Sequence, residues 1–246
     1  MAKFAIISAT YGREQLLNEA VQSLLAQTIR DWEAVIVDGS PTQSRLGFSD
    51  PRVKYFREEN HQLTGLVQAR NFGVRQSDSK YIGYLDDDEY YYPSKLEVMH
   101  NFMEFEARGE FAYHDVVVAV VQWVGDSLQH VCVPRPHWHP EGNPNKVIQK
   151  YSFIAPLQAV HTRNIFEKVG GFRENKSRGI FRGKYRDRIN RFDEDEDLFR
   201  RMAKHTRLER VPLQLAEYRV HGSNVNAWGV DYQQILKQKR LPKPYY

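Results

Sequence analysis

The chain has 246 residues, 41% of them hydrophobic and 13% aromatic, which is enough for one large domain with a substantial core. Its single cysteine, Cys132, excludes an internal disulfide and a cysteine-based zinc site, and no apolar run approaches the length of a membrane helix, about 18 residues. The formal net charge of +4 is uneven, because residues 173–191 carry +6 and residues 231–246 carry +3. A chain with this charge pattern is not expected to bind nucleic acid. The two basic segments suit an anionic substrate or a membrane surface.

The first half alternates strand-like and helix-like segments. Strands are predicted at residues 4–8, 33–37, 53–56 and 81–85. Apolar residues at helical spacing predict helices at residues 13–27, 63–76 and 93–106. This order predicts an α/β fold with a mainly parallel, Rossmann-like central sheet flanked by helices. Because ligands of such sheets bind beyond the carboxyl ends of the strands, Thr10, Asp38 and the run Asp86–Asp88 are expected to gather at one edge.

The second half is less regular. Its predicted elements are a β-rich segment at 111–124, a short strand or turn followed by a helix within 154–169, a helix at 193–205 and a strand at 211–220. Residues 173–192 are rich in charge and glycine and are predicted to form a loop. The chain shows no internal repeat and no low-complexity linker, which favours a single domain.

The most informative feature is the acidic run Asp86–Glu89, directly after an apolar strand. Like charges placed this close repel each other, so the cluster is unfavourable unless a cation neutralises it. Oxygen ligands suit Mg²⁺ or Mn²⁺, which commonly share coordination with substrate phosphates. The alternative is a solvated acidic turn that caps the helix beginning near Pro93.

Seven short stretches resemble the family 2 glycosyltransferases, which are inverting enzymes with a GT-A fold. They are residues 7–13 (ISATYGR), 36–40 (IVDGS), 69–73 (ARNFG), 81–88 (YIGYLDDD), 169–174 (VGGFRE), 194–201 (EDEDLFRR) and 218–224 (YRVHGSN). Together they cover roughly residues 3 to 225 in the family's order. The family usually has two aspartates before Gly39, whereas this chain has only Asp38, so uridine recognition is less secure.

The resemblance implies a single GT-A domain over residues 1–246. Residues 1–110 would bind the nucleotide sugar, and residues 111–246, including the basic loop 173–192, would bind the acceptor. That loop is expected to act as a lid or to receive an anionic acceptor, with a solvated loop without a role as the alternative.

By this resemblance Asp86 and Asp88 form the family's Asp-X-Asp motif. Asp88 is the expected ligand of Mn²⁺ or Mg²⁺, and Asp86 is expected on the metal or the ribose. Asp87 is assigned to the nucleotide side, and would point away from its neighbours if the segment stays extended. His221 is either a third metal ligand or a hydrogen-bonded structural histidine.

The expected catalytic base is Asp195 in the family's Glu-Asp motif, with Glu194 as the second choice. The alternative is a solvated acidic helix start. The remaining residues assigned to the nucleotide side are Thr10, Tyr11, Arg13, Asp38 and Arg70. A helix N-cap is the alternative for Thr10, and a surface arginine is the alternative for Arg70.

Three further features stay open. The loop residues His137-Trp138-His139 form a poor metal pair and either contact an acceptor or form a plain surface loop. Arg219 either reaches the diphosphate or has a structural role only. The basic tail Lys237–Arg240 could favour a membrane surface.

The expected function is a metal-dependent inverting glycosyltransferase of the hexosyltransferase type. It would move a sugar from a nucleotide-diphosphate donor, expected to be a UDP-sugar, to an acceptor hydroxyl in polysaccharide or glycoconjugate synthesis. The acceptor could be a glycan or a lipid-linked molecule. A cytoplasmic location is expected, with peripheral association at the inner membrane face as an addition. One alternative is a sugar nucleotidyltransferase, but such enzymes usually have a glycine-rich, basic loop near the N-terminus, and residues 8–13 lack the glycine run. The other alternative is a non-catalytic nucleotide- or glycan-binding module.

Overall fold

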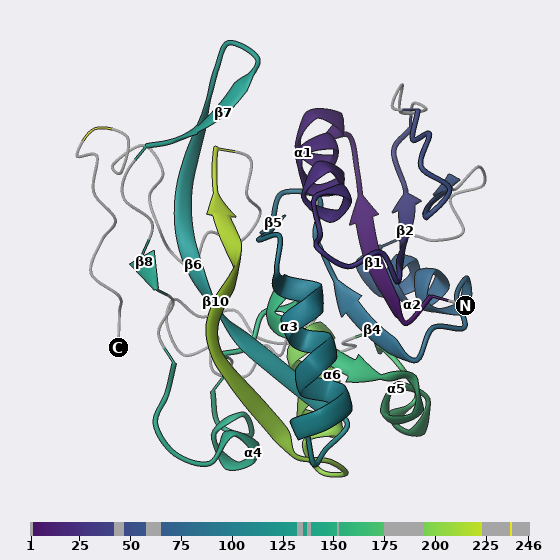
Figure 1. Cartoon of the computed structure of the whole chain (residues 1–246), viewed down its shortest axis with the longest axis vertical. Helices are drawn as coiled ribbons and strands as arrows, with labels where there is room; N and C mark the ends of the chain where they lie inside the picture. Colours follow the sequence, from purple (N-terminus) through teal and green to yellow (C-terminus); the bar gives the residue numbers. More distant parts are fainter. Residues whose placement is uncertain are drawn as a thin grey trace, which may run out of the picture.

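A computed structural model of the chain describes residues 2–41, 47–57, 65–131, 135–136, 139–151, 153–174, 194–222 and 237 (Figure 1). Cys132, the pair His137-Trp138, loop residues 175–192 and most of the basic tail lie outside the described residues. What the sequence predicts for them stays a prediction. Among the described residues, no helix has the length and apolar character needed to cross a membrane.

The strands are β1 (Phe4–Thr10), β2 (Trp32–Asp38), β3 (Val53–Arg57), β4 (Tyr81–Tyr84), β5 (Tyr90–Tyr91), β6 (Phe111–Val124), β7 (Ser127–His130), β8 (Arg135–Pro136), β9 (Ala159–Thr162) and β10 (Leu208–Val220). The helices are α1 (Glu14–Leu25), α2 (Leu66–Arg75), α3 (Lys95–Asn101), α4 (Pro144–Val147), α5 (Arg163–Val169) and α6 (Glu194–Met202). A π-helical turn at Phe102–Glu106 continues α3, and a 3₁₀ turn at Pro156–Gln158 precedes β9.

The strands form one mixed sheet in the order β3-β2-β1-β4-β9-β6-β10-β5, with β7 and β8 attached to β6. Strands β3, β2, β1 and β4 are parallel, as predicted. Strand β9 runs antiparallel to β4 and β6, and β10 runs parallel to β6. Two antiparallel steps restore the direction, so β10 ends at the same edge of the sheet as β1 and β4. This brings the second half of the chain to the edge predicted for the site.

Helices cover both faces of the sheet because β1 is apolar on both faces. Phe4 and Ile6 pack with α1 in one buried cluster, whereas Ala5 and Ile7 pack with α2 in the other. Alternate residues of a strand point to opposite faces, so each helix packs on one set. Helix α2 approaches β1 closely at Gly73, where an added Cβ atom would lie 2.7 Å from Ile7 Cγ2.

The predicted helix at 93–106 and strand at 211–220 differ from the structure in detail. The helical hydrogen-bond pattern changes to π-type at Phe102, and β10 begins earlier, at Leu208. The two-residue strand β5 escapes prediction because it exists only through pairing with β10, Tyr91 opposite Ala216.

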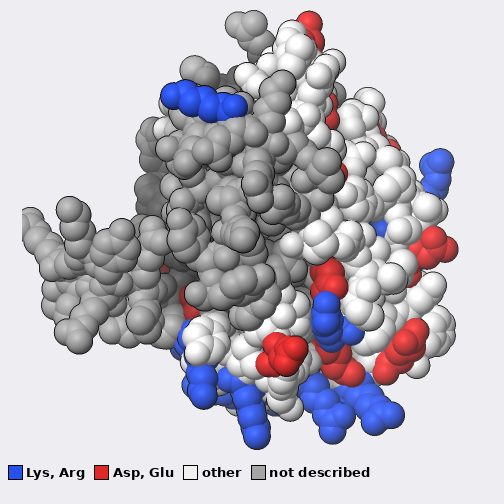
Figure 2. Space-filling model, turned by 90° about the vertical axis from the view of Figure 1, so that its left-hand side faces the viewer, with Lys and Arg blue, Asp and Glu red and all other residues white. Residues whose placement is uncertain are grey.

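Arg13 and Arg70 contact the acidic run, but other basic side chains gather away from it. Figure 2 shows Lys and Arg concentrated along the lower rim of one face. A shallow hollow lies at the amino-terminal ends of β6 and β10, lined by residues 107–110 and 204–207 and including Arg108, Lys204 and Arg207. The carboxyl ends of the same strands lie at the opposite edge of the sheet, so this basic rim is remote from the acidic run.

His161 on β9 lies in the core between the rings of Phe166 and Phe111, stacked at 5.7 and 6.2 Å between ring centroids. Its Nδ1 lies 2.9 Å from the carbonyl oxygen of Thr162, so Nδ1 carries the proton. Its Nε2 then accepts a hydrogen bond from the Tyr84 hydroxyl at 2.8 Å. Burial lowers the pKa of His161 to about 4, because a charged imidazolium would lose its solvation.

We expect His161 to make the fold sensitive to mild acid. In the unfolded chain His161 is protonated below about pH 6.5, whereas in the folded chain it is protonated only below about pH 4. The contribution to the free energy of unfolding is therefore complete above pH 6.5 and falls by up to about 3 kcal/mol as the pH drops to 4. Urea unfolding of wild type and His161→Gln at pH 7 and pH 5 tests this. Equal losses in both proteins would contradict the assignment.

Candidate functional site

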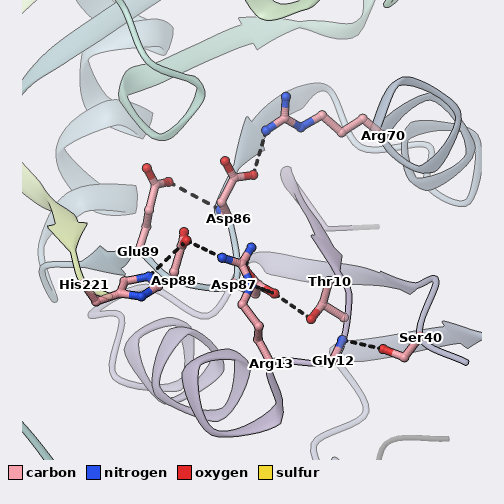
Figure 3. A network of polar contacts seen from close by, with 10 residues as sticks. All are labelled: Thr10, Gly12, Arg13, Ser40, Arg70, Asp86, Asp87, Asp88, Glu89 and His221. Carbon is pink, nitrogen blue, oxygen red and sulfur yellow. Dashed lines mark hydrogen bonds and ion pairs between the residues drawn. The ribbon is translucent and has the colours of Figure 1, made fainter. Parts of the chain in front are cut away.

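The acidic run forms a turn at the carboxyl end of β4. The amide of Leu85 still donates to the carbonyl of Ile7 on β1, at 3.1 Å. The chain then folds back, and the amide of Glu89 donates to the carbonyl of Asp86 at 3.1 Å. The segment therefore does not stay extended. Figure 3 shows that its carboxylates point in different directions, to contacts with β1, α2 and β10. We call residues Asp86–Glu89 the acid turn.

Asp87 points into the protein and joins the acid turn to the β1–α1 connection. Thr10 Oγ1 donates to its Oδ2 at 2.6 Å, and Arg13 contacts both oxygens, Nε at 3.1 Å and Nη2 at 2.5 Å. The side chain is fully buried. Burial raises its pKa to about 7, although the Arg13 charge acts in the opposite direction. The N-cap residue of α1 is Arg13, so the N-cap alternative for Thr10 is wrong.

Asp88 lies between Arg13 and His221. Arg13 Nη1 lies 2.7 Å from Asp88 Oδ2, and His221 Nε2 lies 3.3 Å from the same oxygen. Burial would raise the pKa of Asp88, but the hydrogen bond with His221 and the charge of Arg13 outweigh it and hold the pKa below its usual range. The end of β10 thus brings a histidine to an aspartate that lies 133 residues away in the sequence.

Asp86 turns to the other side, toward α2. Arg70 Nη2 lies 2.7 Å from Asp86 Oδ1, and Arg70 Nη1 lies 3.0 Å from Glu194 Oε1 at the start of α6. The side chain of Arg70 is only 2% exposed, so the alternative of a surface arginine is wrong. The first turn of α6 carries Glu194, Asp195, Glu196 and Asp197. Asp195 Oδ1 accepts the amide of Glu196 at 2.8 Å.

Burial would lower the pKa of Arg70, but the charges of Asp86, Glu194 and Asp195 raise it above its usual value. The acid turn and the expected base therefore interact electrostatically through one arginine. Sequence spacing alone could not bring Asp86 and Glu194 together, because they are joined only through the fold of α2, β4 and α6.

The residues brought together fit a metal ion only in part. Asp88 and His221 converge, whereas Asp86 faces Arg70, and the described residues contain no group of three or more His, Cys, Asp or Glu arranged to hold a metal. One carboxylate and one imidazole suit Mn²⁺ if phosphate oxygens and water supply the remaining ligands. Among the described residues, Asp88 and His221 are the pair whose placement could hold such an ion.

Asp38 organises the neighbouring strand end. Its Oδ1 accepts hydrogen bonds from the amide (2.8 Å) and hydroxyl of Ser40, and its Oδ2 accepts one from the Tyr55 hydroxyl. Ser40 Oγ in turn accepts the amide of Gly12 at 2.7 Å. The loop that carries Tyr11 is thereby tied to β2, and the Tyr11 side chain is exposed. A base contact by Asp38 stays a prediction, and both of its oxygens already accept hydrogen bonds.

Sequence reasoning missed Tyr55 and the group around Glu217. Tyr92 donates to Glu217 Oε1 at 3.0 Å, and Arg219 Nε lies 3.4 Å from Glu217 Oε2 and stacks over the Tyr90 ring. The alternation Glu217, Arg219 places both on one face of β10, and His221 follows directly after the strand, which is a signal that the sequence did contain.

Comparison with known proteins identifies the family. Residues 5–170 match the family model described as "Glycosyl transferase family 2". This chain belongs to glycosyl transferase family 2. The matched region includes the acid turn and ends after α5, so Asp195 and His221 lie beyond it. The expectation of a glycosyltransferase is confirmed at the level of the family.

Named relatives of this family 2 chain match less than half of it. An uncharacterized glycosyltransferase from Rickettsia conorii is 35% identical over 107 residues, which are 42% of this chain and 17% of that protein. The Escherichia coli "UDP-Glc:alpha-D-GlcNAc-diphosphoundecaprenol beta-1,3-glucosyltransferase WfgD" is 29% identical over 103 residues, 40% of each chain. The matched segments thus span less than half the length of these relatives.

Solved structures confirm the GT-A fold. Staphylococcus aureus TarS 1–349 in complex with UDP-GlcNAc has a TM-score of 0.63 and 18% identity, covering 90% of this chain and 60% of that one. The Pyrobaculum calidifontis mannosyltransferase PcManGT with GDP-Man and Mn²⁺ has a TM-score of 0.59 and 16% identity, covering 92% and 59%.

Arg13 and a divalent ion would compete for Asp88, because Arg13 Nη1 already contacts Oδ2. We expect Arg13→Gln to bind Mn²⁺ at least about threefold more tightly than wild type, since a positive charge next to the ion is removed. Arg52→Gln is the matched control, because Arg52 pairs with Asp50 in the turn before β3, away from the acid turn. Titration followed by Mn²⁺ electron paramagnetic resonance measures the affinities. Weaker binding by Arg13→Gln alone would contradict the competition.

Proposed function

We propose that this family 2 chain transfers a sugar from a nucleotide-diphosphate donor to an acceptor hydroxyl, with inversion at the anomeric carbon. The observation that carries the proposal is the convergence of Asp88 and His221, 3.3 Å apart, at the same sheet edge as Asp86, Arg70 and the start of α6. The proposed metal ligands and the acidic first turn of α6 thus lie at one sheet edge, and a transfer between two substrates requires such proximity.

Asp88 and His221 would hold a divalent ion, Mn²⁺ or Mg²⁺, which when bound neutralises charge on the leaving diphosphate. Asp195 accepts the proton of the acceptor hydroxyl. The hydroxyl oxygen forms the new bond to the anomeric carbon from the face opposite the diphosphate, and the electron pair of the broken bond leaves on the phosphate oxygen. Inversion follows from a single displacement, so no covalent intermediate on the protein is involved.

A UDP-sugar is the proposed donor. The names of two similar proteins support this donor, because WfgD is named for UDP-Glc and TarS was solved with UDP-GlcNAc. PcManGT was solved with GDP-Man, which makes guanine the main competitor. A lipid-linked or growing glycan is the proposed acceptor, by analogy with the diphosphoundecaprenol substrate in the name of WfgD. We further propose a cytoplasmic location, in keeping with a chain that has one cysteine.

A thermal-shift screen tests the donor side. UDP, GDP, CDP and dTDP are each added with and without Mn²⁺ to wild type, Asp88→Ala and the exposed control Asp126→Ala. At a concentration 100 times Kd, UDP with Mn²⁺ should add about 2.7 kcal/mol of stability, or roughly 5–10 °C in Tm. The shift should persist in Asp126→Ala and vanish in Asp88→Ala. No shift with any nucleotide would instead favour a non-catalytic module.

A second test concerns the base. Asp195→Asn should lower kcat for sugar transfer or sugar-nucleotide hydrolysis by roughly 10²- to 10⁴-fold while leaving the Kd for UDP unchanged. Asp197→Asn is the matched control in the same helical turn, because Asp197 pairs with Arg201 at 2.8 Å. Its kcat should stay within about threefold of wild type. Equal losses in the two variants would assign the effect to the helix and not to a base.

A further inference from the structure

Arg70 is a fully buried cation beneath the site. Its side chain is 2% exposed, whereas its two partners lie nearer the surface, Asp86 at 27% and Glu194 at 17% exposed. A buried charge is costly unless it is paired and hydrogen-bonded. Within the described residues, both ion pairs of Arg70 go to carboxylates that belong to different elements, the acid turn and α6.

Aromatic rings fix the guanidinium of Arg70 in place. Its Cζ lies 5.5 Å from the centre of the Phe172 ring and 5.9 Å from that of Tyr84. The two rings pack edge-on against each other at 5.4 Å. Cation–π contacts of this kind restrict the guanidinium to one orientation. The packing of the core therefore fixes the direction in which the guanidinium of Arg70 presents its two terminal nitrogens to Asp86 and Glu194.

Two neighbours of Arg70 on α2 contact the segment that ends at Glu174. Asn71 Nδ2 donates to the carbonyl of Phe172 at 2.9 Å, and the amide of Phe172 donates back to Asn71 Oδ1 at 3.0 Å. Gln68 donates to Glu174. One helix thus fixes both the chain that leads to residue 174 and the chain that resumes at Glu194.

Without Arg70, the acid turn and the first turn of α6 would repel each other. Asp86 on one side and Glu194 and Asp195 on the other are all carboxylates, and all three raise the pKa of Arg70 through their charges. Removing the shared cation leaves like charges in a partly buried place. The start of α6 would then move away, and Asp195 would move with it. A displacement of about 1 Å is enough to slow a positioned reaction about 10²-fold.

We propose that Arg70 is a positioning residue that sets Asp195 against the donor site by joining Asp86 to Glu194. The inference rests on the proposed function, in which Asp195 is the base. It departs from the expectation that Arg70 contacts the nucleotide or diphosphate. It also gives Glu194 a role as the anchor of α6 and leaves Asp195 as the base.

The test uses Arg70→Met, Arg70→Lys, Glu194→Gln and the double variant Arg70→Met/Glu194→Gln. Release of UDP from UDP-glucose and from UDP-GlcNAc gives kcat and the donor KM, and calorimetry with UDP and Mn²⁺ gives Kd. We expect Arg70→Met to lower kcat about 30- to 100-fold, with KM and Kd within about threefold of wild type. Arg70→Lys should recover part of kcat. The double variant should lose no more than the worse single variant, because both break one interaction.

Arg163→Met is the matched control. Arg163 also contacts the region of α2, donating to the carbonyls of Val74 at 3.2 Å and Ser79 at 3.0 Å, but at and beyond the carboxyl end of the helix, whereas Arg70 lies in its middle. It should lower Tm without changing kcat. If Arg70→Met does not fold, Arg70→Lys and Glu194→Gln provide the same comparison with smaller changes.

Amide hydrogen exchange supplies a readout that does not depend on turnover. Amides 198–201 bond to carbonyls in the first turn of α6, so their exchange should speed up in the Arg70 and Glu194 variants and not in Arg163→Met. If the wild-type protein shows no turnover, the proposed function is wrong, but hydrogen exchange still tests the positioning role of Arg70. Unchanged exchange in the Arg70 and Glu194 variants would contradict the positioning role. So would a Kd raised more than tenfold with kcat intact, or losses that multiply in the double variant.

Discussion

The structure depends on the neutralisation of carboxylates that the fold concentrates at one sheet edge. The acid turn alone contributes four acidic residues, and the first turn of α6 contributes four more. Arg13 and Arg70 stand on either side of the acid turn and each contacts carboxylates from it. Because Coulomb energies grow as the surroundings exclude water, these pairs count for more here than on an exposed surface.

The two arginines separate the carboxylates into groups with different tasks. Arg13 holds Asp87 and reaches Asp88, where a divalent ion would have to share the same oxygen. Arg70 pairs with Asp86 and with Glu194 on α6. The two outer carboxylates of this Asp-X-Asp sequence therefore have different partners. The turn between them directs Asp88 to His221 and Asp86 to Arg70, which also contacts the helix with the expected base.

Glu89, the last residue of the acid turn, is buried, and so is the basic residue Lys95 at the start of α3. Burial raises the pKa of the carboxyl and lowers that of the ammonium, each away from its charged form. Lys95 Nζ sits 3.1 Å from the centre of the Tyr91 ring and donates to the carbonyl of Leu157. These contacts connect the start of α3 to β5 and to the 3₁₀ turn before β9. Glu89 interacts with Lys95 through its charge, which raises the pKa of the ammonium against the effect of burial.

The sequence by itself determined the parallel half of the sheet, the position of the acid turn after β4 and the family to which the chain belongs. These follow from local patterns, namely apolar runs, helical spacing and short motifs whose order survives without a structure. It also indicated that Thr10 and the aspartates would share one edge, because carboxyl ends of parallel strands must meet.

Only the tertiary structure decided how the side chains pair. Asp88 contacts His221 because the two antiparallel pairings of β9, with β4 and with β6, leave β10 parallel to β4. Asp86 contacts Arg70 and does not face His221, because the chain turns between Asp86 and Glu89. Tyr55 lies opposite Ile36 in the pairing of β3 with β2, and its hydroxyl reaches Asp38 two residues further along β2. A sequence pattern fixes which residues lie at an edge, but long-range pairing of charges depends on packing that no local spacing encodes.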